Sequence, residues 1–240
     1  MTRHRIASVF AILISCSTCS LAQFDGGMMA GYGGAMATVG LNAMNTQMLL
    51  GTMPSSSVTA ANSKRTNKPI AHTLTQVDIQ AAATDRSLSK LASVYPEQHR
   101  GKVVATMRQL LDGFHKIEQQ FAIPRNDMAG AIAGFLAGSY MAYQDTEFPD
   151  ENFKPLVNQM RQIVSSNPDF AKASSAEKQE MYEQMAVLGM FMATTQMALK
   201  ENPNPQVAAN MKQAAKGYLE QFLKTDANKV FLTANGLEIR

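Results

Sequence analysis

The sequence predicts an all-α protein: an irregular bundle of about six or seven helices, preceded by a signal peptide and a Gly/Met-rich low-complexity segment. Apolar residues recur at steps of three and four over most of the chain after residue 76, which is the spacing of amphipathic helices. Short segments with proline or asparagine separate these stretches, as in a bundle with tight connections. With 45% hydrophobic and 17% charged residues, the composition suits one globular domain with a segment appended.

The first 22 residues have the pattern of a secretory signal peptide. Residues 1–5 are basic, residues 6–15 are apolar or small, and Ser20 and Ala22 offer small side chains at the −3 and −1 positions of a cleavage site. The apolar run is about half as long as the roughly 20 residues that a spanning helix needs, so we expect no transmembrane span in the mature chain. This pattern predicts an exported protein, periplasmic or secreted.

A second processing route stays open, because residues 13–16 resemble a bacterial lipobox in which Cys16 would carry a lipid anchor. We favour cleavage after Ala22, since the apolar run then keeps a polar stretch before the cut. That cut removes both Cys16 and Cys19, so the mature protein would contain neither a disulfide nor a thiol nucleophile.

The mature chain divides by composition into three parts. Residues 23–53 hold seven of the 15 glycines and six of the 17 methionines with one charge, Asp25, and form the Gly/Met-rich segment. Residues 54–75 are rich in Ser, Thr, Asn and Pro without apolar periodicity, which is typical of a solvated linker. The helical domain is expected from residue 76 to residue 240.

The first half of this domain predicts three helices. One covers residues 85–94 and stops before Pro96, and a longer one follows, with Gly113 as a candidate break that would divide it in two. Residues 128–143 contain no charge and indicate a central buried helix. Its glycines lie every four residues on one face, so a neighbouring helix can approach closely; they are Gly130, Gly134 and Gly138.

The second half predicts a turn at residues 149–155, a helix that ends at the Asn-Pro pair 167–168, and two longer helices. Ser174 and Glu177 have the spacing of a capping box at the start of the first of these. Asn and Pro residues at 202–205 end that helix and begin the next. Residues 230–233 are too few to assign from the sequence, and Val230 and Phe231 permit an extended segment docked on the bundle.

Two short motifs resemble an uncharacterised family of bacterial exported proteins, a domain-of-unknown-function grouping with a signal peptide, a variable low-complexity segment and a helical C-terminal domain. One is residues 126–131 (NDMAGA), similar to the start of the family's central helix; the other is residues 231–237 (FLTANGL), similar to its closing stretch. The resemblance covers residues 73–239 and implies export and an α fold. Asp127 is the polar member of these motifs, and we expect it to start a helix.

The charges argue against a nucleic-acid partner. The formal net charge of the whole chain is +3, but from residue 76 onward 17 basic side chains face 18 acidic ones. The folded part is therefore near neutral and has no basic stripe to neutralise phosphates.

Sequence patterns for catalysis are weak. Ser139 follows a glycine but lacks the second glycine of a nucleophile elbow, and His72, His99 and His115 have no metal-ligand spacing. Four carboxylates gather at residues 145–151, without the glycine of an EF-hand-like loop, so we interpret them as a solvated turn. A hydrolase with a carboxylate pair remains an alternative, and its candidate acids stay unranked without a fold: Asp112, Glu118, Asp127, Asp145 and Glu147.

Methionine enrichment leaves a third alternative, Cu(I) binding by thioethers at Met28 and Met29 or at Met190 and Met192. Helical methionines at core spacing favour packing instead. We therefore predict no catalytic, cofactor-binding or metal-ligating residues and no cofactor. The preferred hypothesis is a non-enzymatic exported module that binds another envelope protein or an envelope component.

Overall fold

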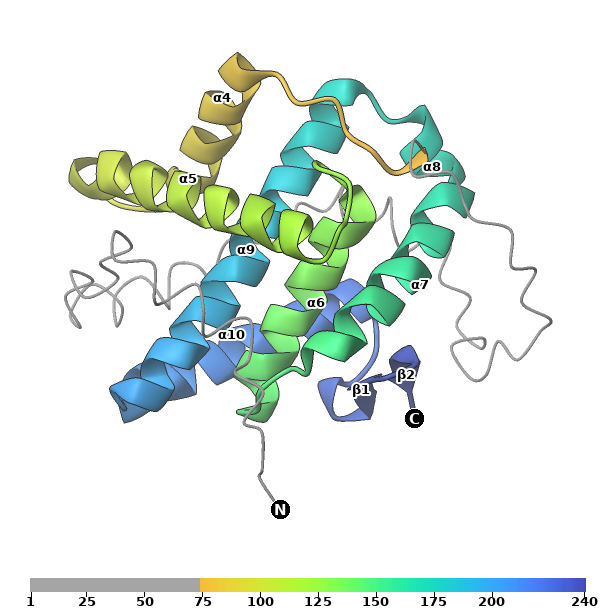
Figure 1. The fold of residues 1–240 in the computed structure, drawn as a ribbon. Helices are drawn as coiled ribbons and strands as arrows, with labels where there is room; N and C mark the ends of the chain where they lie inside the picture. Colours follow the sequence, from red (N-terminus) through yellow and green to blue (C-terminus); the bar gives the residue numbers. More distant parts are fainter. Residues whose placement is uncertain (1–73) are drawn as a thin grey trace.

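The computed structural model describes residues 74–240, and this part of the chain folds into seven α-helices and one β-hairpin (Figure 1). The predicted signal peptide, the Gly/Met-rich segment and all but the last two residues of the predicted linker lie outside the described residues. The helices are α4 (Ala81–Ala92), α5 (Glu97–Gln120), α6 (Met128–Gln144), α7 (Phe153–Ser166), α8 (Pro168–Lys172), α9 (Ser175–Glu201) and α10 (Pro205–Leu223). The predicted all-α bundle is confirmed.

Helices α6 and α9 form the centre of the bundle. Both are buried on every side over most of their length, which explains the uncharged sequence of α6. In Figure 1 the two helices run through the middle of the domain, with α5 across one end and α7 along the side. α4 and α5 pack on one part of α9, and α7 and α10 pack on α6.

The predicted close approach to the glycine face of α6 is confirmed. A Cβ atom at Gly138 would lie 2.2 Å from the carbonyl oxygen of Gly189 on α9, and a Cβ at Gly189 would lie 2.6 Å from the backbone of Gly134. The two backbones therefore touch where they cross, and only glycine fits there. Gly130 faces Ile123 instead, at 3.1 Å from its would-be Cβ.

Several predicted helix ends are confirmed. Ser174 accepts from the Glu177 backbone N–H, and Glu177 reaches back to the Ser174 N–H, so the capping box opens α9. Asn204 caps α10, where Pro205 takes the first position.

Three local predictions are wrong. α5 continues through Gly113, because the apolar face on both sides of this glycine packs into the core and outweighs the small propensity cost. The predicted turn at 149–155 ends early: a 3₁₀ turn (Asp150–Asn152) leads into α7, whose first turn tolerates Pro155. The helix predicted at 85–94 runs from Ala81 to Ala92.

The C-terminal residues fold back as a hairpin on α7. Strands β1 (Val230–Thr233) and β2 (Gly236–Ile239) pair antiparallel, after a 3₁₀ turn (Ala227–Lys229). The side-chain amide of Gln159 on α7 makes two hydrogen bonds to the backbone of β2. Its oxygen accepts from the Leu237 N–H at 2.6 Å, and its nitrogen donates to the Leu237 carbonyl at 3.0 Å. The predicted docked extended segment is thus one strand of a hairpin.

None of the helices in the described part of the chain is long and apolar enough to cross a bilayer.

Candidate functional site

Four buried residues with polar side chains gather where α5 turns into α6. We call Glu118, Asp127, Arg161 and Tyr182 the corner network; they come from α5, the start of α6, α7 and α9. All four are buried, and Glu118 and Asp127 are only 1% and 0% exposed. Their hydrogen bonds therefore hold four helices together in a medium where unpaired polar atoms are costly.

Asp127 has two structural tasks. One carboxylate oxygen caps α6 by accepting from the Ala129 N–H at 3.2 Å, as the sequence predicts for a helix-start residue. The other oxygen forms an ion pair with the Arg161 guanidinium, and Arg161 also donates to Asn158 at 3.1 Å. The pair ties the start of α6 to α7.

Glu118, near the end of α5, completes the corner network. Its Oε1 accepts from the Asp127 N–H at 3.1 Å and from the Tyr182 hydroxyl at 3.0 Å, whereas its Oε2 is buried with no hydrogen-bond partner among the described residues. Burial raises the pKa of Glu118 to about 7 from 4.5, although the hydrogen bond from Tyr182 opposes the shift. Burial and the nearby Glu118 also raise the pKa of Tyr182.

His115 lies beside the corner network. Its ring stacks on Tyr182 with the ring centres 6.4 Å apart, and its Nδ1 lies 3.2 Å from the Arg125 guanidinium. Burial, and then the Arg125 charge, lower the pKa of this half-buried His115 ring below its usual value.

A second polar cluster joins α4 to α9. The Gln179 amide pairs with the backbone of Gln80 in both directions at 2.9 Å, and Glu183 accepts from Thr84 at 2.6 Å and from Gln179 at 2.9 Å. Gln179 and Glu183 lie one turn apart on α9 and are buried. This cluster holds the start of α4 against α9. The residues just before α4 form the extended segment that leads into the domain.

Residues 75–77 of that segment are hydrogen-bonded to the loop that joins α5 to α6, next to the corner network. The Val77 N–H donates to the Asn126 carbonyl and the Met128 N–H donates to the Thr75 carbonyl, both at 2.9 Å. Thr75, at the end of the predicted linker, is fully buried. In the loop, Ala122 and Asn126 have φ values of 51° and 61°, a left-handed conformation that is uncommon for residues other than glycine.

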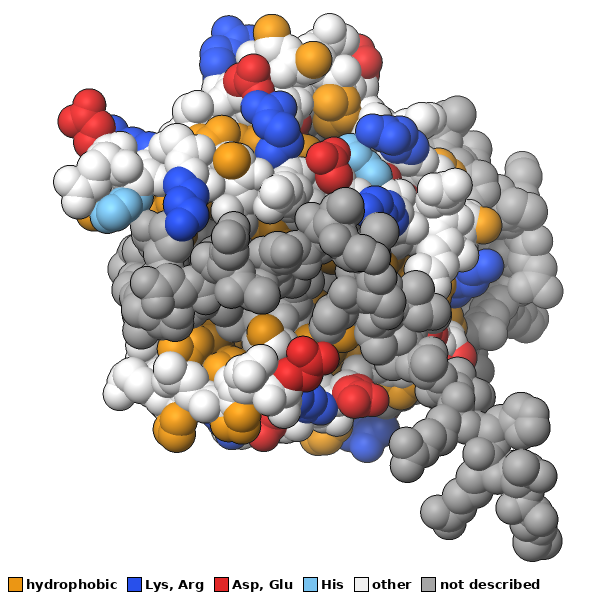
Figure 2. Space-filling view, turned by 60° about the vertical axis from the view of Figure 1, so that its left-hand side comes forward, with side chains coloured by type: hydrophobic (Ala, Val, Ile, Leu, Met, Phe, Trp, Pro, Cys, Tyr) orange, Lys and Arg blue, Asp and Glu red, His pale blue; other side chains and the backbone are white. Residues whose placement is uncertain are grey.

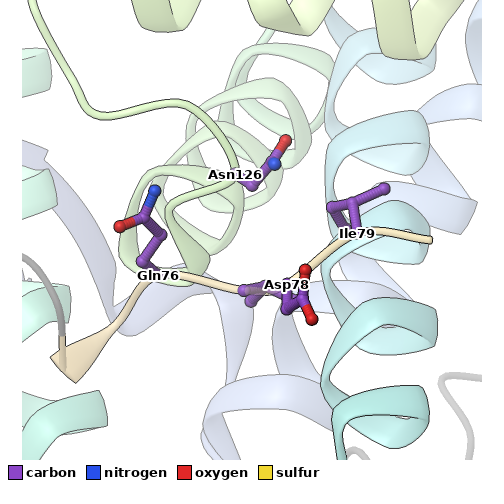
Figure 3. Close-up of a pocket in the computed structure, with 5 residues that line it drawn as sticks. Gln76, Asp78, Ile79 and Asn126 are labelled. Carbon is purple, nitrogen blue, oxygen red and sulfur yellow. The ribbon is translucent and has the colours of Figure 1, made fainter.

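A surface pocket of about 400 Å³ lies along the same segment. It is lined by residues 76–79 and Asn126, and Figure 3 shows Gln76, Asp78 and Ile79 along one extended stretch with Asn126 on the neighbouring loop. In this bridge geometry the N–H and C=O of Gln76 point away from the loop. The backbone groups of Gln76 and Asp78 have no hydrogen-bond partner within residues 74–240.

Of the candidate acids, the structure brings Glu118 and Asp127 together and leaves the others on the surface. Asp112 is exposed on α5, Asp145 accepts from Gln196 at the end of α6, and Glu147 lies 3.9 Å from Lys200. The described residues contain no group of three or more His, Cys, Asp or Glu arranged to hold a metal ion.

The other sequence candidates lie elsewhere. Ser139 is buried in α6 and has no hydrogen-bond partner among the described residues, and His99 lies on α5. Met190 and Met192 pack in the core. Met28, Met29 and His72 lie outside the described residues.

Sequence reasoning missed Arg161, Gln179, Tyr182 and Glu183. A usable indication exists for Arg161, which falls four residues after Val157 on the apolar face of its helix. The other three lie on a helix buried all round, where no polar face marks them.

The chain belongs to a family of unknown function, DUF6683, whose model matches residues 1–240. No curated protein and no solved structure matches the chain.

Proposed function

We propose that this protein is an exported, non-enzymatic module that binds another envelope protein through the pocket along residues 76–79. The observation that carries the proposal is the pocket itself, beside which the backbone groups of Gln76 and Asp78 have no hydrogen-bond partner within residues 74–240. Such groups match an extended protein segment, which can add to them as a strand while its side chains enter the pocket.

The surroundings support a protein partner. Leu74, just before the pocket, has 57% of its surface exposed. Leu74 and Val94, at 45%, are the two exposed large apolar side chains in the described part of the chain. An exposed apolar side chain next to open backbone groups suits a contact that buries it.

The carboxylate pair supports a structural role better than hydrolysis. Glu118 and Asp127 lie beneath the loop that joins α5 to α6, and each already accepts hydrogen bonds from other residues of the domain. A general acid must reach the proton or oxygen that it serves, and these two carboxyl groups are almost completely covered.

The surface charge supports this choice of partner class. Figure 2 shows blue and red side chains intermixed on the visible face. Two ion pairs involving α4 offset basic charges: Asp85 with Arg108 on α5, and Lys90 with Glu180 on α9. A mixed surface of this kind does not favour the phosphate backbone of nucleic acids.

Site-specific photo-crosslinking in cells tests the proposal. A photoreactive residue replaces Gln76 in the pocket or, as the control, Gln98, which is also an exposed glutamine and lies on α5. We expect a discrete crosslinked protein from position 76 that is absent from position 98. Crosslinks at both positions, or at neither, would contradict binding at the pocket.

The export part of the proposal has its own test. The intact mass of the protein recovered from cells should correspond to a chain that begins at Gln23. A mass that begins at Cys16 with acyl chains would instead make the protein a lipoprotein.

A further inference from the structure

We infer that the partner segment that binds at the pocket carries a basic side chain, lysine or arginine, at the position opposite Asp78. This inference names the chemistry of the partner and rests on the proposed function, in which an extended segment of another protein adds along residues 76–79.

Asp78 is an exposed acidic side chain on the open edge of this segment. Thr75 and Val77 are buried against the domain, whereas Gln76 and Asp78 are exposed, which is the alternation of a strand with one face on the core. Figure 3 places Gln76 and Asp78 along the same extended stretch. A residue of an added strand that pairs with Asp78 would have its side chain on the same face, with the two Cβ atoms about 5 Å apart.

The Asp78 carboxylate has no cation within the described residues. It takes part in none of the ion pairs formed within residues 74–240, and it accepts a hydrogen bond from the neutral side-chain amide of Gln80 at 3.3 Å. The other residues that line the pocket are uncharged. Arg125, next to the pocket residue Asn126, lies 3.2 Å from Nδ1 of His115 instead. The pocket therefore presents a negative charge that a partner can neutralise.

This charge selects among the strands that could add to the edge. A charged side chain on an open edge limits which strands pair with it, and a like charge directly opposite is unfavourable. An opposite charge in that position is favourable and fixes the register of the added strand. The volume of about 400 Å³ gives a long basic side chain room, and the amide oxygen of Gln76 can accept a hydrogen bond from it. A basic segment thus satisfies both the backbone groups and the carboxylate.

Photo-crosslinking from position 76, combined with charge variants of Asp78, tests the inference on the full chain in cells. We expect the yield of the crosslinked protein to fall about threefold in Asp78→Asn and about tenfold or more in Asp78→Lys. The matched control is Glu201→Lys, which reverses an exposed carboxylate at the end of α9. Gln179, which contacts the Gln80 backbone beside the pocket, lies roughly 30 Å from that end along the helix, so the control should leave the yield unchanged.

Mass spectrometry of the crosslinked product identifies the partner segment. We expect a segment of another protein with lysine or arginine within two residues of the linked position. Replacing that basic residue by glutamate should abolish the crosslink to the wild type and restore it to Asp78→Lys, because the two charges are then exchanged.

The outcomes separate this inference from the proposed function. A linked segment without a basic residue, or an undiminished yield in Asp78→Lys, would overturn the inference and leave binding at the pocket intact. The absence of a crosslink from position 76 in the wild type, or a link to this chain itself, would contradict the proposed function and the inference together.

Discussion

Replacing Glu118 by glutamine should change how the stability of the protein depends on pH. Burial raises the pKa of this carboxyl from 4.5 to about 7, so between these pH values the folded state binds a proton that the unfolded state has lost. The contribution of Glu118 to the free energy of unfolding is therefore fully present below about pH 4.5 and is lost as the pH rises to about 7. The shift corresponds to roughly 3 kcal/mol, at about 1.4 kcal/mol for each pH unit.

The assay is urea unfolding of the wild type and of Glu118→Gln from pH 4.5 to pH 8. We expect the wild type to lose about 3 kcal/mol relative to the variant over this range. His115 has a lowered pKa and acts in the opposite direction, because unfolding then takes up a proton at low pH; subtracting the two curves removes its contribution. A difference that stays constant within about 0.5 kcal/mol would refute the assignment of a buried neutral Glu118.

Two further predictions concern packing and the ion pair. Gly189→Ala forces a methyl group into the backbone of α6 and should destabilise the fold by about 3 kcal/mol or more. The control Gly217→Ala, whose added Cβ would meet nothing within 4 Å, should stabilise the fold by about 0.5–1 kcal/mol. Equal melting temperatures for the two variants would contradict the close crossing of α6 and α9. Arg161→Met should cost about 3–5 kcal/mol in denaturant unfolding, because the Asp127 charge stays buried alone, and adding Asp127→Asn should recover part of it. No recovery in the double variant would show that Arg161 acts by packing.

The helices of the domain could be predicted because their determinants are local. The capping box at Ser174 and Glu177 and the start at Pro205 depend on contacts within a few residues, and the structure has both. The break expected at Gly113 is absent for a related reason: local propensity favours a break, but the core contacts that keep α5 continuous come from α9.

The corner network could be predicted only in part. Asp127 was recognised as a helix start from its neighbours, but its partner Arg161 lies 34 residues further on. Glu118 remained one acid among five, because its burial depends on Tyr182, 64 residues away. Sequence spacing within one helix carries no information about which distant side chains meet, so the site emerged only from the fold.

The close contact between α6 and α9 at their glycines could be predicted better than the corner network but less fully than the helix ends. The repeat on α6 predicted a close neighbour, and its period alone was enough for that. The identity of the neighbour, α9 at Gly189, depends on how the two helices cross, which no repeat specifies.

The most direct test of the buried neutral carboxyl is a ¹³C NMR titration of the glutamate side chains, with the Glu118 resonance assigned by its absence in Glu118→Gln. A midpoint near pH 7 is the result expected from the burial of this group. A midpoint at or below 4.5 would show a solvated or cation-paired carboxylate, and would contradict the corner network as described.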